Sequence, residues 1–137
     1  MRETILLFHF GNQEQTRRLK MLLLSMKIKI RSVELWEYNT PLGVLAGVMD
    51  GDDYPDYQGD DLETEAMIFC GLSHSRLNQV LDAIHKRGIG SIPYKAVLTP
   101  TNQHWTISQC YEELKRERAA IQAAQEMRNS GDAGQAP

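Results

Sequence analysis

Two short stretches of the chain are apolar at almost every position. Thr4–Phe10 (TILLFHF) and Ala66–Leu72 (AMIFCGL) lack the alternation that is typical of a strand with one solvent-exposed face. Because a strand that is buried on both faces reads as a continuous apolar run, we predict two central strands. The stretch 28–33 alternates more and predicts an edge strand, and Tyr94–Thr99 (YKAVLT) predicts a fourth strand.

Helical spacing of apolar residues follows each strand. Asn12 is a typical N-cap, and the helix after it carries Leu19, Leu22, Leu23 and Met26 on one face. A short helix is expected over Leu42–Val48, after Thr40-Pro41. A third helix is expected from Ser73 or Ser75 to Gly88, with an apolar face of Leu77, Val80, Leu81 and Ile84.

The last helix has a strong start signal. Thr106 and Gln109 form the pattern of a capping box, and we expect this helix to pack on the sheet through Ile107, Tyr111 and Leu114. It is predicted to fray after about Met127. Residues 128–137 (RNSGDAGQAP) lack apolar anchors, so we expect them to be disordered.

The predicted order of elements is β-α-β-α-β-α-β-α. It favours an α/β fold with a single domain over 1–127 and a four-stranded, mainly parallel sheet that has helices on both faces. We expect the strand order 2-1-3-4, with every strand pointing the same way. The alternative is a ferredoxin-like two-layer sandwich with an extra C-terminal helix, because 4–33 and 66–99 repeat a strand–helix–strand unit. In that arrangement, the C-terminal helix or a partner subunit would cover the second face of the sheet.

The charges are unevenly distributed. The net charge is −3, yet residues 50–65 (DGDDYPDYQGDDLETE) hold eight acids and no base, so the rest of the chain, with 15 bases and ten acids, carries +5. We interpret 50–65 as an acidic loop that contributes almost nothing to the core, and whose deletion over 51–63 leaves the fold intact. The remainder lacks the basic stripe that nucleic-acid binding needs, and no apolar run is long enough to span a membrane.

Cys70 and Cys110 lie far apart and form no C-x-x-C motif. This usage is typical of reduced, buried thiols in a cytoplasmic protein. The N-terminal residues do not resemble a signal peptide, which agrees with a cytoplasmic location.

Three stretches of the chain resemble a small bacterial family that is classed only as a domain of unknown function. They are 93–117, 67–89 and the PLGVLAG turn at 41–47, and the most distinctive part is the string K-A-V-L-T-x-x-N-x-x-W over 95–105. The resemblance implies a bacterial, cytoplasmic, stand-alone domain. It implies no reaction and no catalytic residue.

In an open parallel sheet, ligands bind beyond the carboxyl ends of the strands. With all strands parallel, the turns after the first, third and fourth strands gather at one edge of the sheet. We therefore predict a ligand-binding edge that contains Asn12, Ser73, His74, Thr99 and Asn102. The competing interpretation is structural, because Asn12 and Ser73 are also good helix caps.

No catalytic, cofactor or metal motif accompanies this edge. The turns match no phosphate-binding motif, the four histidines lack metal-ligand spacing, and the acidic loop departs from the EF-hand pattern. We therefore predict a non-catalytic binding or regulatory module without cofactor or metal, with a protein or small-molecule partner and with self-association as a homodimer. The alternative is a small enzyme that uses Cys70, His74 and Asn102 at the same edge.

Overall fold

A single sheet organises the computed structural model, which describes residues 2–51 and 53–135, with side chains described as far as residue 128. Its four strands lie in the order β2-β1-β3-β4, as the sequence predicts. The strands are β1 (Thr4–Phe8), β2 (Lys29–Val33), β3 (Ala66–Cys70) and β4 (Tyr94–Val97).

The sheet is mainly parallel, but its two central strands are antiparallel. β1 pairs with β2 in parallel and β3 with β4 in parallel, whereas Thr4 of β1 lies opposite Cys70 of β3 and Phe8 opposite Ala66. The prediction that every strand points the same way is therefore wrong. A continuous apolar run reports that a strand is buried on both faces and carries no information about its direction. The long connection between β2 and β3 accommodates either direction.

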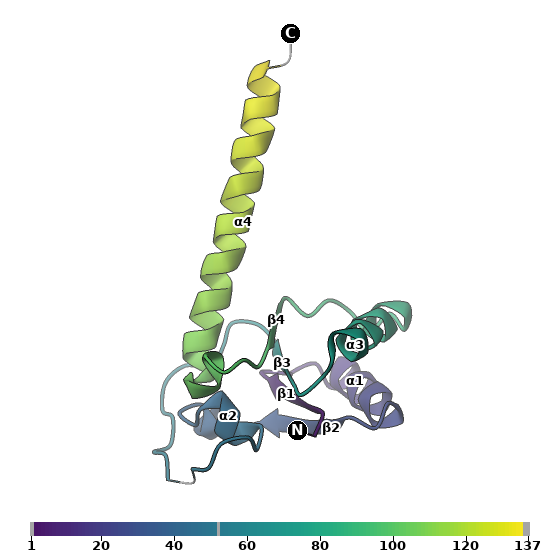
Figure 1. Ribbon diagram of the computed structural model, residues 1–137, viewed down its shortest axis with the longest axis vertical. Helices are drawn as coiled ribbons and strands as arrows, with labels where there is room; N and C mark the ends of the chain where they lie inside the picture. The colour runs from purple at the N-terminus through teal and green to yellow at the C-terminus, as the bar shows by residue number, and fades with distance from the viewer. Residues whose placement is uncertain (1, 52, 136–137) are drawn as a thin grey trace.

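Helices cover both faces of the sheet. α1 (Gln13–Ser25) and α3 (His74–Lys86) lie side by side on one face, and α2 (Leu42–Leu45) and the base of α4 (Ile107–Gln135) lie on the other (Figure 1). Two short 3-10 helices, η1 (Leu35–Glu37) and η2 (Asn102–His104), complete the described elements. The predicted α/β class and the helices on both faces are confirmed. The two-layer alternative is wrong about the layers, but it implies the observed strand directions, with the first two strands antiparallel to the last two.

Each face of the sheet has its own hydrophobic cluster. Ile5 and Leu7 of β1 and Met67 of β3 pack beneath α1 and α3, whereas Leu6 and Ile68 pack beneath α2 and α4. Successive strand residues point to opposite faces, so two covered faces require apolar residues at every position. The chain's own helices thus account for the apolar strands, and no dimer is needed to cover them.

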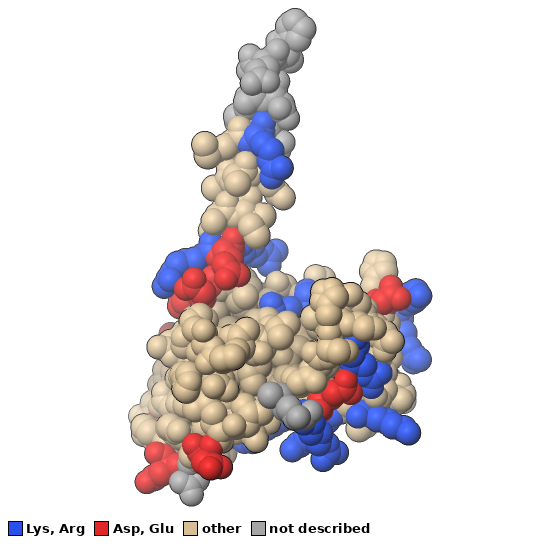
Figure 2. All heavy atoms as spheres, in the orientation of Figure 1, with Lys and Arg blue, Asp and Glu red and all other residues tan. Residues whose placement is uncertain are grey.

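The long α4 projects from the body of the molecule (Figure 1). Its first turns pack on the sheet through Ile107, Tyr111 and Leu114, as predicted. Acidic and basic side chains gather at its base (Figure 2), where Lys115 pairs with Glu112 and Arg116 with Glu113. The backbone is helical to Gln135, beyond the point at which the sequence predicts fraying. Residues 136–137 lie outside the described residues, and a disordered tail over 128–137 stays a prediction.

The acidic loop is packed against the body. The Tyr57 ring lies 5.5 Å from that of Tyr38, centroid to centroid, and its backbone N–H donates to the Trp36 carbonyl at 3.0 Å. Leu62 is only 8% exposed and belongs to the cluster beneath α2 and α4. The expectation that this loop contributes almost nothing to the core is therefore wrong.

Among the described residues, no helix has the length and apolar character needed to cross a membrane.

Candidate functional site

The strand directions divide the predicted ligand-binding edge. Asn12 follows the carboxyl end of β1, whereas Ser73, His74, Thr99 and Asn102 follow the carboxyl ends of β3 and β4. Because β3 is antiparallel to β1, these two groups lie at opposite edges of the sheet. The sequence-based prediction that Asn12 and Asn102 share one edge is therefore wrong.

Thr99 and Asn102 hold the turn after β4 together. The Asn102 side-chain oxygen accepts from the Thr99 N–H at 2.8 Å, and the Thr99 hydroxyl accepts from the Asn102 N–H at 3.0 Å. The Asn102 side-chain amide donates to the Val97 carbonyl at 2.9 Å, and the residue is 8% exposed. Both polar ends of this side chain are thus occupied by the turn.

Ser73 and His74 start α3. The Ser73 hydroxyl accepts from the Arg76 N–H at 3.1 Å, which makes Ser73 the N-cap, and Asn12 caps α1 in the same way through the Gln15 N–H. His74 is exposed and borders an open hollow on the outer side of α3. These caps match the structural interpretation of the polar turns.

Cys70 is not placed for nucleophilic chemistry. It is the last residue of β3, it is fully buried, and burial raises the pKa of its thiol to about 12. A nucleophilic thiol needs an accessible position that favours the thiolate. Burial likewise raises the pKa of Cys110 to about 11. The two cysteines are free, in agreement with the expected reduced thiols.

A cluster that the sequence did not reveal joins the end of β1 to the acidic loop. His9 Nδ1 lies 2.9 Å from one carboxylate oxygen of Asp61, and the Tyr38 hydroxyl donates to the other at 2.7 Å. The Leu62 N–H donates to that second oxygen as well, also at 2.7 Å. Three segments that are distant in sequence thus converge on a single carboxylate.

The protonation states of this cluster follow from its geometry. Burial alone would raise the pKa of Asp61, but hydrogen bonds from His9, Tyr38 and the Leu62 N–H outweigh it and lower the pKa below 3.8. Burial and the neighbouring Asp61 raise the pKa of Tyr38 above its usual range. Asp61 is therefore a carboxylate near neutral pH, and Tyr38 is a neutral donor to it.

The Asp61 carboxylate fixes the orientation of the His9 ring. A carboxylate only accepts hydrogen bonds, so Nδ1 carries the hydrogen, and in the neutral ring Nε2 carries a lone pair. Asp61 is the polar partner of the His9 side chain among the described residues. His9 thus presents Nε2 without a protein partner in the described part of the chain.

His9 lines a cleft of about 450 Å³ at the carboxyl ends of β1 and β2. Leu7, Val33 and Tyr38 provide buried surface, while Thr16 and Lys20 come from α1. The remaining lining residues are Phe10, Gly11, Ser32, Glu34, Leu35 and Asp61. We call this hollow the His9 cleft. It lies where the parallel β1–β2 pair ends, which is the kind of position at which open α/β sheets bind ligands.

The backbone at His9 is also unusual. Its φ is 61°, in the left-handed region that is uncommon for residues other than Gly, although His, like Asn and Asp, adopts it more often than the rest. This places a strained residue at the same point as the His9–Asp61 contact. Such strain persists where the surroundings hold the residue in place, and it is concentrated at functional sites.

Sequence reasoning missed this cluster because its members have no fixed spacing. His9 falls within the predicted strand Thr4–Phe10, and Asp61 is one of the eight acids in residues 50–65. The available signal was a polar residue at the end of a continuously apolar strand. No group of three or more metal-ligating side chains gathers in the described residues.

The family comparison agrees with the sequence resemblance. A family model described as a domain of unknown function (DUF3783) matches residues 65–121. This match spans β3, α3, β4, η2 and the first half of α4, and it includes the stretches 67–89 and 93–117. The turn at 41–47 and the His9 cleft lie outside it. Searches of curated proteins and of solved structures returned no match.

Proposed function

We propose that the protein is a non-catalytic binding or regulatory module whose ligand binds in the His9 cleft. The observation that carries this proposal is the His9–Asp61–Tyr38 chain, with its distances of 2.9 and 2.7 Å. It fixes an imidazole before any ligand arrives and leaves Nε2 available. A binding group that is already ordered loses less conformational entropy when the ligand binds.

The polar groups of the cleft define the ligand. In its neutral form, His9 offers an acceptor at Nε2, and Lys20 offers a cation that has no ion-pair partner among the described residues. A complementary molecule carries hydrogen-bond donors for Nε2 and for the Glu34 carboxylate, which also lines the cleft, and an acceptor for Lys20. The cleft volume of about 450 Å³ is typical of sites for small molecules. We therefore infer a small polar ligand.

Several observations favour binding over catalysis. Cys70, the proposed nucleophile of the enzyme alternative, is fully buried, and His74 is exposed. In the His9 cleft, the Thr16 hydroxyl donates to the Asn12 carbonyl at 2.7 Å. No hydrogen bond joins Ser32 to His9 among the described residues. The base in this cleft thus lacks an activated nucleophile.

Three further parts of the proposal have narrower support. A separate proposal is that a ligand binds at the other edge of the sheet, at Ser73, His74, Thr99 and Asn102. Of these side chains, His74 is exposed and does not hold a turn or a helix cap. A cytoplasmic, bacterial setting is supported by the free cysteines and by the sequence resemblance. Self-association as a homodimer, like a protein partner, would use a surface other than the sheet faces, since helices cover both.

Native mass spectrometry of the purified protein tests the proposal. We expect the wild type to retain a small polar molecule and His9→Asn to lose it. Asparagine tolerates a positive φ, so this change removes the imidazole with little strain. The exposed His104 provides the matched control, because His104→Asn should retain the molecule. The same spectra report whether a dimer forms.

Nuclear magnetic resonance provides a second readout. In long-range ¹H–¹⁵N spectra of the neutral imidazole, we expect Nδ1 of His9 to be protonated and Nε2 to carry the lone pair. A set of small polar metabolites should include one that shifts the Nε2 resonance. If no member does, and wild type and His9→Asn retain the same material in the mass spectrometer, the proposed site is wrong.

A further inference from the structure

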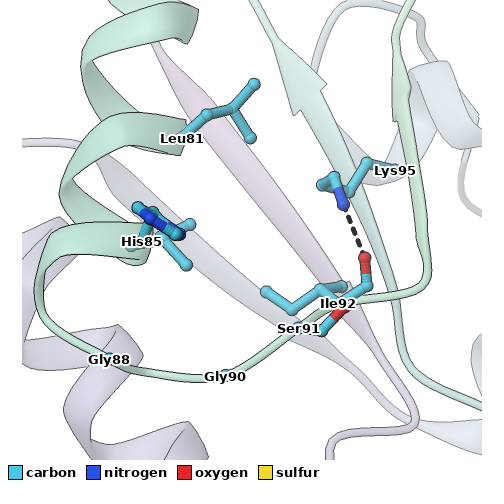
Figure 3. Close-up of a pocket in the computed structure, with 8 residues that line it drawn as sticks. Leu81, His85, Gly88, Gly90, Ser91, Ile92 and Lys95 are labelled. Carbon is cyan, nitrogen blue, oxygen red and sulfur yellow. Dashed lines mark hydrogen bonds between the residues drawn. The ribbon is translucent and has the colours of Figure 1, made fainter.

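A second hollow lies beside the C-terminal half of α3, within the segment that the family model matches. It has a volume of about 580 Å³ and lies between α3, the loop 88–92 and β4. Figure 3 shows Leu81 and His85 on α3, facing Lys95 on β4 across this space, with Gly88, Gly90 and Ser91 below. We call it the Lys95 pocket. It shares no lining residue with the His9 cleft.

The charges of the Lys95 pocket have one sign. Lys95 and His85 are its ionisable lining residues, and no aspartate or glutamate lines it in the part of the chain whose side chains are described. The nearest acid on α3, Asp82, is paired with Lys86 at 2.9 Å on the solvent side of the helix. A ligand in this pocket therefore meets an ammonium group that no lining carboxylate neutralises.

The Lys95 ammonium is held in place with donors to spare. Its Nζ donates to the Ile92 carbonyl at 2.6 Å, the bond drawn in Figure 3. An ammonium group has three hydrogens, so two remain for a ligand. Lys95 lies opposite Met67 in the β3–β4 register, and Met67 belongs to the cluster beneath α1 and α3. The lysine thus points to the face of the sheet that α3 covers.

The other walls of the pocket are apolar. Leu81 and Ile92 point into the space between α3 and the loop (Figure 3). Ile84 of α3 also lines it. The loop is bound to the body from behind, because the Arg18 guanidinium donates to the carbonyls of Arg87 and Gly88. The loop is therefore anchored at its start, and the pocket offers hydrophobic contact next to an exposed cation that one hydrogen bond orients.

We propose that the Lys95 pocket binds a small organic monocarboxylate with an apolar body. The carboxylate accepts hydrogen bonds from Lys95 Nζ, and the apolar body lies against Leu81, Ile84 and Ile92. Charge-assisted hydrogen bonds of this kind are the strong ones in protein sites. This inference does not depend on the His9 cleft.

Titration with octanoate, followed by amide chemical shifts, tests the proposal. We expect octanoate to shift the Gly88, Gly90 and Ser91 amides and Lys95→Met to weaken its binding roughly tenfold or more. Lys29→Met, which removes an exposed lysine of the opposite edge strand β2, should leave the affinity unchanged. Lys95→Gln is a second variant that retains a polar end without the charge, and it should weaken binding to a similar extent.

Two further ligands separate the contribution of the carboxylate charge from that of the apolar chain. Octan-1-ol has the same chain without the charge and should bind roughly tenfold more weakly than octanoate. Inorganic phosphate has the charge without the chain and should not shift these amides at millimolar concentration. Octanol binding as tight as octanoate, phosphate binding as tight as octanoate, or Lys95→Met binding like wild type would each overturn the proposal. His9→Asn should bind octanoate normally, so the two proposals fail separately.

Discussion

His9 combines a strained backbone with a fixed side chain. Its φ of 61° costs roughly 1 kcal/mol in an L-residue. β1 fixes the chain before it, the Asn12 cap fixes the chain after it, and Asp61 holds the ring. The surrounding structure therefore determines both the backbone conformation and the direction of Nε2. This is the residue-scale basis for placing function at the end of β1.

The lowered pKa of Asp61 makes stability depend on pH in a defined direction. A carboxyl group whose folded-state pKa lies below its unfolded value of 3.8 stabilises the fold above pH 3.8, and this contribution is lost as the pH falls through the folded pKa. Denaturant melts from about pH 5 to about pH 3 should therefore show a steeper loss for wild type than for Asp61→Asn. Identical slopes would mean that the cluster does not form.

The burial of Cys70 and Cys110 predicts slow thiol chemistry. Their exposed fractions are 0% and 3%, and burial raises their thiol pKa values to about 12 and about 11. At pH 8, both are therefore neutral thiols shielded from reagent. A thiol-reactive dye should label neither in the native protein and both in denaturant. Rapid native labelling of Cys70 would reopen the enzyme alternative.

At the scale of elements, the chain contains two similar β-α-β units that meet at the antiparallel β1–β3 pair. α1 and α3 each have 13 residues, and each begins at a side-chain cap, Asn12 or Ser73. Each helix is also followed, two residues after its last residue, by a residue with a positive φ. This residue is Lys27 after α1, with a φ of 60°, and Gly88 after α3, with a φ of 61°. The first unit therefore has a lysine at the position where the second has glycine, the residue that adopts a positive φ most readily.

This difference predicts opposite effects at equivalent positions. Lys27→Gly should raise the free energy of unfolding by about 1 kcal/mol, because glycine adopts a positive φ without strain. Gly88→Ala should lower it by about 1 kcal/mol for the same reason, and nothing lies within 4 Å of the added methyl group. Chemical denaturation of the two variants measures both. Equal signs would contradict this account of the helix ends.

The start of α4 predicts a third stability effect. The Thr106 N–H donates to the Gln109 side chain at 2.9 Å, and the Gln109 N–H points back to the Thr106 hydroxyl at 3.4 Å. Thr106→Ala removes the acceptor for that first-turn N–H and should destabilise the protein by about 1 kcal/mol. Thr106→Ser keeps the hydroxyl and is the control. An equal free energy of unfolding for Thr106→Ala and wild type would show that the capping box contributes nothing to stability.

The sequence predicted elements well because their signals are local. The apolar runs of β1 and β3, the caps at Asn12 and Ser73, and the box at Thr106 each lie within a few residues. Strand direction was not predictable, since the connection from β2 to β3 has no signal that selects it. The candidate site depended on that direction, so its members separated when β3 proved antiparallel to β1.

At the scale of the whole molecule, the long connection performs two tasks. It carries the chain from the end of β2 to the start of β3, and it brings Asp61 to His9 and Leu62 into the core. Contacts between such distant segments leave no trace in local sequence patterns. The sequence therefore could not predict the His9 cleft, because its residues come together only in the folded chain.

Deleting 51–63 tests whether the acidic loop is structural. The deletion removes the buried Leu62, the Tyr57 ring that packs on Tyr38, and the Asp61 carboxylate. Loss of a buried leucine alone costs about 2 kcal/mol or more, so the shortened protein should be strongly destabilised. A matched variant with Asp53, Asp56 and Asp60 changed to asparagine removes exposed charges, keeps these contacts and should melt like wild type. If the shortened protein melts like wild type, the loop contributes nothing to the stability of the core, as expected from the sequence. The orientation of the His9 ring would then not depend on Asp61.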